Sequence, residues 1–119
     1  MKMRDFRNLD AWHKAHKLTL DVYRASESFP RSETFGMAAT LRRGSAQFAM
    51  KIAEACGQDT AVDFIGGLGR ARALGMEVEY QLLLSRDLQF MKPENYDALQ
   101  AQVIEVRRML SGLMKTAAA

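Results

Sequence analysis

Apolar residues recur at intervals of three and four residues in four separate stretches of the chain, which is the spacing of one face of an α-helix. These stretches predict helices over residues 9–28, 33–57, 61–89 and 93–115. In the first stretch the charged residues fall opposite the apolar stripe, as in an amphipathic helix with one solvent-facing side. The pattern contains no alternation typical of strands, so we expect an all-α protein.

The ends of the predicted helices contain residues that favour helix starts and stops. Asn8 is a good N-cap for the first helix, and Thr60, followed three residues later by an aspartate, resembles a capping box. Pro30 ends the first stripe, whereas Pro93 stands in a first turn, where proline is tolerated. Because the connections are short, neighbouring helices should run antiparallel. We therefore expect a single domain, residues 1–119, folded as an antiparallel up-down-up-down four-helix bundle.

Two of the predicted helices hold more apolar or small residues than one bundle core requires. The second helix has an additional apolar side formed by Ala39, Ala46, Met50 and Ala53. The third helix contains Gly66, Gly67, Gly69 and Gly75. The wide apolar arc indicates either a central helix or a contact with another subunit. Each glycine in a helix interior costs about 1 kcal/mol of stability relative to alanine. Four such residues therefore indicate either close packing against another backbone or a local break in the helix. No strand precedes these glycines, which argues against a phosphate-binding loop.

Composition fits one globular domain in the cytoplasm. The 119 residues are 48% apolar and 26% charged, close to the usual globular balance. The longest apolar runs fall far short of the roughly 20 residues that span a bilayer, and the amino terminus lacks the apolar core of a signal peptide. Cys56 is the only cysteine, which fits a reducing compartment and a small core residue. We expect a cytoplasmic protein without a membrane partner.

The net charge of +3 is distributed unevenly along the chain. Residues 1–57 hold ten basic and six acidic side chains, whereas residues 58–119 hold seven basic and eight acidic. Phosphate contacts that ignore base sequence need little more than a basic patch, so RNA or DNA is a candidate partner, although no known reading module is visible. Ordinary solvated helix faces are the alternative explanation. The candidate contact residues are Lys14, Lys17, Arg42 and Arg43, together with an amino-terminal arm containing Lys2, Arg4 and Arg7.

Several charged or polar side chains fall on the apolar faces of the predicted helices. They include His16 and Arg42 on the first two helices, and Arg72, Glu79 and Arg86 on the third. A buried charge without a partner costs several kcal/mol. We therefore predict that Glu79 pairs with Arg42, Arg72 or Arg86 across a helix interface. A polar pocket for a small ligand around His16, Arg42 and Glu79 is the alternative.

The sequence argues against the enzyme classes that helix bundles commonly host. A di-iron carboxylate site needs two Glu-x-x-His motifs and two further glutamates, but the chain has only His13 and His16, and no such motif. The nucleophile elbow, the P-loop and the dinucleotide-binding glycine pattern are also absent. We expect a non-catalytic protein with no metal and no cofactor.

Several segments resemble one family of small bacterial proteins. These segments are residues 6–16, Phe29-Pro30, Phe35-Gly36-Met37, Leu41-Arg42-Arg43, Ile52-Ala53-Glu54 and residues 77–82. In order and spacing they resemble the bacterial four helix bundle protein family, whose members are often encoded in intervening sequences of the large-subunit ribosomal RNA gene. The chain is also similar to the accessory variability protein of diversity-generating retroelements, a basic pentamer that binds nucleic acid and a reverse transcriptase.

This resemblance implies an up-down-up-down bundle assembled into a homopentamer, and it implies no assigned activity. At Lys51 and Ala55 the family commonly has asparagine and glycine, so a ligand site built on those residues is not expected. We therefore expect a non-catalytic homo-oligomeric binding or scaffold protein, with nucleic acid as the first ligand to test and a small-ligand binding protein as the alternative. The polar residues that the resemblance singles out are His16, Arg42, Arg43, Glu54, Glu77, Glu79 and Gln81.

Overall fold

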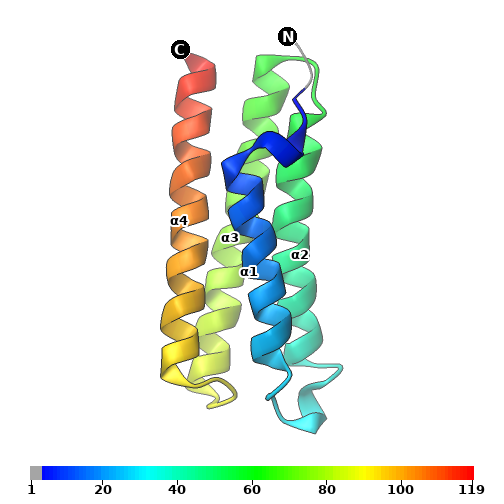
Figure 1. Cartoon of the computed structure of the whole chain (residues 1–119), viewed down its shortest axis with the longest axis vertical. Coiled ribbons are helices and arrows are strands. Elements are labelled where there is room, and N and C mark those ends of the chain that lie inside the picture. Colours follow the sequence, from blue (N-terminus) through cyan, green and yellow to red (C-terminus); the bar gives the residue numbers. More distant parts are fainter. Residues whose placement is uncertain (1–3) are drawn as a thin grey trace.

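The computed structural model describes residues 4–119 and contains four long α-helices that lie side by side (Figure 1). They are α1 (Asp10–Ser26), α2 (Met37–Cys56), α3 (Ala61–Asp87) and α4 (Pro93–Ala118). Two short 3₁₀ helices, η1 (Phe6–Asn8) and η2 (Arg31–Glu33), precede α1 and α2. The described residues contain no strand, which confirms the all-α prediction. The bundle measures 47 × 21 × 19 Å, and its connecting segments lie at alternating ends (Figure 1).

Two observed helix boundaries differ clearly from the predicted ones. Helix α2 begins at Met37, four residues later than expected, because η2 and a turn occupy the preceding segment. The carboxylate of Glu33 accepts a hydrogen bond of 2.9 Å from the Met37 amide and so satisfies one free donor at the start of α2. Helix α4 continues to Ala118 instead of ending at residue 115. No described helix is long and apolar enough to cross a membrane.

Of the two predicted helix caps, the one at α3 is present and the one at α1 is not. The Asn8 prediction is wrong, because Asn8 belongs to η1 and Leu9 is the residue before α1. At α3 the Thr60 hydroxyl accepts a hydrogen bond of 3.1 Å from the Asp63 amide, which confirms the predicted capping interaction. The observed start of α3, Ala61, is also the predicted one.

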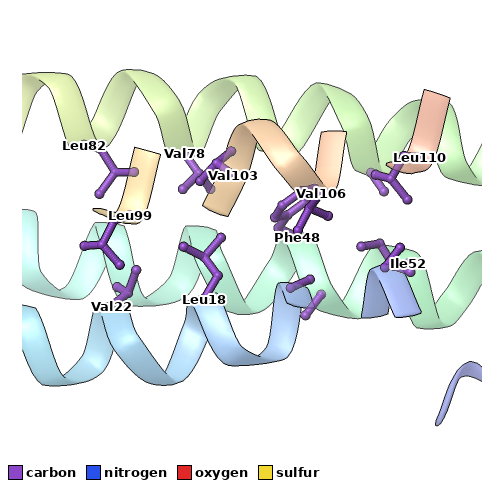
Figure 2. Close-up of a cluster of buried hydrophobic side chains, with 14 of the residues drawn as sticks. Leu18, Val22, Phe48, Ile52, Val78, Leu82, Leu99, Val103, Val106 and Leu110 are labelled. Atoms are coloured by element: carbon purple, nitrogen blue, oxygen red, sulfur yellow. The ribbon is translucent and has the colours of Figure 1, made fainter. Parts of the chain in front are cut away.

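One apolar core runs between all four helices along the bundle (Figure 2). Complete burial of a valine, leucine, isoleucine or phenylalanine side chain stabilises the fold by roughly 1.5–3 kcal/mol relative to leaving that side chain exposed. Cys56 lies in this core at 1% exposure, and burial raises the pKa of its thiol. The largest fully buried side chains are Leu18 and Val22 of α1, Leu41, Phe48 and Ile52 of α2, Phe64, Leu68, Val78 and Leu82 of α3, and Val103, Val106 and Leu110 of α4.

Two of the α3 glycines are required by close packing inside the bundle. A Cβ atom at Gly67 would lie 2.8 Å from the Cβ of Ala55 in α2. A Cβ atom at Gly75 would lie 2.9 Å from Cγ of Arg107 and 3.1 Å from Cε1 of Phe48. Helix α3 is continuous through all of its glycines. Close approach of the α2 backbone therefore explains Gly67, contact with the Arg107 and Phe48 side chains explains Gly75, and the local break is excluded.

The outward side of α3 is apolar as well. Val62, Met76 and Tyr80 are 77%, 54% and 62% exposed. The 3.6-residue helical repeat places Gly66 and Gly69 on the same side, where an added Cβ would reach only ordinary contact distances of 3.6 and 3.5 Å. Exposed apolar surface beyond single scattered side chains commonly marks a contact with another molecule. The second and third helices were both expected to carry surplus apolar surface: on α3 it includes these three exposed side chains, and on α2 Met50 is 56% exposed.

Candidate functional site

Lys14 and Lys17, two of the predicted phosphate-binding residues, are both in ion pairs. The Nζ atom of Lys14 lies 2.9 Å from the carboxylate of Glu105 in α4. The Nζ atom of Lys17 lies 2.7 Å from the carboxylate of Asp21, one turn further along α1. Each positive charge therefore has a carboxylate partner within the chain, and this lowers its availability for a phosphate.

Arg42 and Arg43 are neighbours in sequence but differ in their contacts. The Arg42 guanidinium donates hydrogen bonds of 2.7 Å to the Ser26 hydroxyl and 3.2 Å to the Tyr23 carbonyl, and it lies 4.9 Å from the Tyr23 ring centroid. It thus holds the last turn of α1, whose dipole favours a cation there. Arg43 is exposed and has no ion pair within residues 4–119. Of the four residues predicted to contact phosphate, Arg43 is consequently the most available for such a contact.

The amino-terminal basic arm folds back onto the bundle. Lys2 lies outside the described residues. The Arg4 guanidinium lies 3.9 Å from the ring centroid of Phe64 in α3. Arg7 pairs with Asp5 at 3.3 Å. The described part of the arm therefore contacts the bundle through Arg4, whereas Arg7 remains 69% exposed and pairs within the arm.

Glu79 is ion-paired, but its partner is Arg107 of α4. The two side chains are only 17% and 26% exposed. The prediction of a pair across a helix interface is confirmed, and the predicted choice of partner is wrong, because Glu79 lies on the side of α3 that faces α4. The three predicted partners bond elsewhere: Arg42 to Ser26, Arg72 to Ser111 and Arg86 to Asp87.

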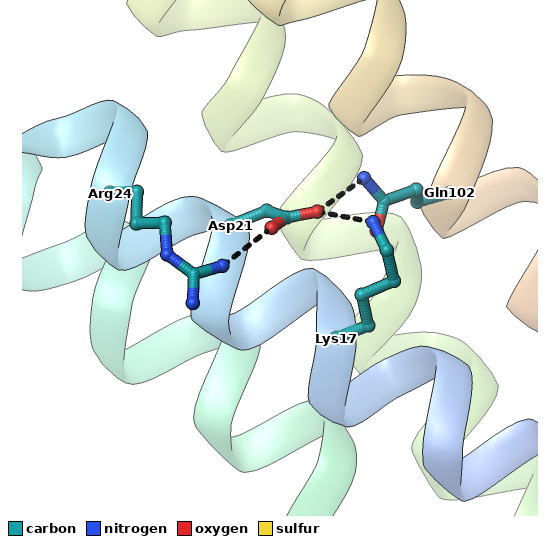
Figure 3. Close-up of polar contacts among 4 residues, drawn as sticks. All are labelled: Lys17, Asp21, Arg24 and Gln102. Carbon is teal, nitrogen blue, oxygen red and sulfur yellow. Dashed lines mark hydrogen bonds and ion pairs between the residues drawn. The ribbon is translucent and has the colours of Figure 1, made fainter.

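A polar cluster between α1 and α4 was not predicted from the sequence (Figure 3). Asp21 accepts a hydrogen bond of 3.0 Å from the Gln102 amide and contacts Lys17 at 2.7 Å and Arg24 at 3.1 Å (Figure 3). Burial alone would raise the pKa of Asp21, but the bonds from Lys17 and Gln102 and the charges of Lys17 and Arg24 hold that pKa below its usual value. Beside the cluster lies an open pocket of about 380 Å³, also lined by Ala25, Asn95, Ala98 and Leu99.

Lys17 and Arg24 stand one helical turn before and after Asp21, so their pairing follows the ordinary spacing of helix surface pairs. Gln102 is 81 residues away in sequence, and no local signal points to it. Among residues 4–119, no group of three or more His, Cys, Asp or Glu side chains is placed to hold a metal ion. The cluster is a polar contact between two helices, in which one carboxylate is shared by two cations.

Comparison with known families identifies the chain's relatives. A model of the 23S rRNA-intervening sequence protein family matches residues 7–112. The chain belongs to this family. A search of curated proteins gave no match.

A solved structure of a protein with unknown function, from the S23 ribosomal protein family of Bacteroides thetaiotaomicron, has a similar fold to this intervening sequence protein. The TM-score is 0.80 at 21% sequence identity, and the similarity covers 88% of this chain and 98% of that chain. At this identity the likeness concerns the fold alone.

The polar residues that the resemblance singled out lie at different helix interfaces in this intervening sequence protein. His16 is exposed on α1 and stacks on Trp12, with ring centroids 5.0 Å apart and an interplanar angle of 7°. Arg42 joins α2 to α1, whereas Glu79 joins α3 to α4. These three side chains are therefore not brought together into one pocket.

The other matched residues lie along α2 and α3. The Gln81 side chain packs against Gly44, where a Cβ atom would lie only 2.5 Å from its Oε1 atom. Glu54 pairs with Lys51 at 2.9 Å. Glu77 is exposed and has no ion pair within the described chain. In this member of the family, Arg43 and Glu77 are thus the two exposed matched charges that remain without an ion-pair partner.

Proposed function

We propose that this intervening sequence protein is a non-catalytic, homo-oligomeric scaffold or binding protein of the cytoplasm. In this proposal residues 1–119 form one antiparallel up-down-up-down bundle, which is one subunit of a ring of five. The observation that supports assembly is the outward side of α3, where Val62, Met76 and Tyr80 are each more than half exposed. Exposed apolar surface of this kind commonly marks a contact with another protein. The resemblance to the bacterial four helix bundle family supports five subunits.

Light scattering coupled to size-exclusion chromatography tests the assembly. At tens of micromolar we expect a mass of about 67 kDa, five times the 13.4 kDa of one chain. The physical reason is that association removes the α3 surface from water. A mass of 13.4 kDa at this concentration would contradict assembly. A stable dimer or tetramer would contradict only the number of subunits.

Nucleic acid is the ligand class that we propose for this assembly. Lys14 and Lys17 are already engaged in ion pairs in the subunit, so Arg43 is the residue on which the proposal depends most. A ring repeats the same exposed cation on every subunit, and affinity for a polyanion grows with the number of phosphates contacted. A small ligand bound at a polar pocket is the second possibility, and the open pocket beside Asp21 is where it would bind.

Fluorescence anisotropy with mixed-sequence RNA and DNA tests the nucleic-acid proposal. We expect binding at low ionic strength that weakens steeply as salt is added, because cation–phosphate contacts release counterions. Arg43→Ala should weaken binding several-fold and reduce the salt dependence. Lys14→Ala is the matched control, since Glu105 already neutralises Lys14. Absence of binding to both polymers at low ionic strength would contradict the proposal.

A further inference from the structure

The segment before α1 covers one end of the apolar core. Residues 4–8, which we call the strap, lie against α1 and α2 at the end of the bundle where α2 ends (Figure 1). Most of the strap is η1, and the Asp5 carboxylate caps this short helix by accepting a hydrogen bond of 3.0 Å from the Arg7 amide. The strap therefore has local structure of its own outside the four long helices.

The strap contacts three of the four helices. The Arg4 amide donates a hydrogen bond of 3.3 Å to the carbonyl of Cys56, the last residue of α2, which is one of the carbonyls that a helix end leaves without an intrahelical partner. The Arg4 guanidinium lies 3.9 Å from the ring centroid of Phe64 in α3. The Phe6 ring packs edge-on against Trp12 of α1, with the centroids 4.8 Å apart. The strap thus links the ends of α1, α2 and α3.

Beneath the strap the core is closed to solvent. Cys56 and Phe64 are each 1% exposed. Burial raises the pKa of the Cys56 thiol, while the charge of Arg4 lowers that pKa and the charge of Asp5 raises it. Because charge interactions weaken with distance, both charged residues of the strap lie near this thiol. The strap is therefore positioned to shield Cys56 from solvent.

The strap is held less firmly than the helices beneath it. No residue of η1 is fully buried, and the exposed residues of the strap are Arg4, Asp5, Arg7 and Asn8. Its hydrogen bond to α2, at 3.3 Å, is longer than most N–H···O bonds. The four long helices, by contrast, share one continuous buried core. Segments with few buried contacts open at a lower free energy than the whole fold, so the strap can open while the bundle remains folded.

We propose that the strap is a gate over this end of the core, which opens and closes while the four-helix bundle stays folded. Small molecules in solution reach Cys56 only while the strap is open. The side-chain contacts of Arg4 and Phe6 with the bundle hold the closed state, so their removal shifts the gate toward the open state. This inference goes beyond the proposed function, because the gate requires neither assembly nor nucleic acid.

The reaction of Cys56 with an aromatic disulfide reagent measures how often the gate is open. The Cys56 thiolate attacks the reagent, forms a mixed disulfide and releases one coloured thiolate, and because Cys56 is the only cysteine the colour reports this position alone. The double variant Arg4→Ala/Phe6→Ala removes both side-chain contacts with the bundle. We expect it to react about tenfold faster than the wild type. An unchanged rate would overturn the inference.

Arg7→Ala is the matched control, because it removes a cation of the strap that does not hold the bundle. The Arg7 guanidinium pairs with Asp5 at 3.3 Å and lies 4.5 Å from the ring centroid of Phe6, and both of these residues belong to the strap. The Arg7 carbonyl, which accepts a hydrogen bond from the His13 ring, is unchanged by the substitution. The control should react within about twofold of the wild-type rate. A control as fast as the double variant would also overturn the inference. Circular dichroism checks that each variant is folded.

Urea separates opening of the strap from unfolding of the bundle, and this measurement needs only the wild type. Opening a short segment exposes little surface, so the labelling rate at low urea should depend on urea much less steeply than the unfolding equilibrium does. Equal dependence would mean that Cys56 is reached only by global unfolding, which would overturn the gate. These outcomes do not involve the assembled mass or the affinity for nucleic acid, so failure of the gate leaves the proposed function intact.

Discussion

Glu79→Leu is expected to lower the free energy of unfolding by about 3–5 kcal/mol, because it leaves the charge of Arg107 largely buried without its partner. The two side chains are 17% and 26% exposed. Among the described residues, neither Oε2 of Glu79 nor Nε of Arg107 has a further hydrogen-bond partner. In the structure no second acceptor therefore contacts the Nε atom of Arg107. Urea denaturation followed by circular dichroism, at one fixed protein concentration, measures the loss.

The double variant Glu79→Leu/Arg107→Met is the control for this effect. Removing both charges also removes the desolvation cost of burying them, so we expect a stability close to that of the wild type or higher. The exposed pair Lys51–Glu54 gives a second comparison, because Glu54→Gln should have a much smaller effect. If the double variant were as unstable as Glu79→Leu, the loss would come from altered packing and the ion-pair explanation would be wrong.

The helices themselves could be predicted because each apolar stripe reports directly on one buried face. The ion-pair partner of Glu79 could not be predicted, because it depends on how far α3 is rotated about its axis relative to α4. A rotation that directs Glu79 toward α2 instead would have satisfied the same periodicity. Periodicity therefore predicts that a polar residue lies near an interface without specifying which interface.

The candidate binding residues show a related limit. Lys14 and Lys17 share a basic stretch of sequence, but Glu105 neutralises Lys14 from a position 91 residues further along the chain. A count of charges in one half of the sequence does not detect such a partner. The outward apolar side of α3 was indicated only by its glycines, because Val62, Met76 and Tyr80 lie outside the stripe that faces the core.

Gly67→Leu is expected to lower the free energy of unfolding by about 1–2 kcal/mol, as the net result of two opposed effects. Leucine favours the helix by up to about 1 kcal/mol relative to glycine. Overpacking opposes this, because even the first carbon would lie 2.8 Å from Cβ and 3.0 Å from Cα of Ala55. The Cα atom belongs to the backbone, so α2 and α3 must move apart, and such overpacking typically costs 1–3 kcal/mol, occasionally more. Urea denaturation at fixed protein concentration measures the difference.

Gly112→Leu is the matched control, because Gly112 also lies in a helix, α4, but a Cβ there would have no neighbouring atom within 4 Å. The same substitution then adds helix propensity without overpacking, so stability should rise by up to about 1 kcal/mol. A loss of stability for Gly67→Leu together with a gain for Gly112→Leu would show that the effect at Gly67 comes from the tight contact between α2 and α3 and not from the general effect of glycine on a helix. A rise in stability at both positions would mean that α2 and α3 can separate at little cost, and the close contact between Gly67 and Ala55 would then not determine the spacing of the bundle.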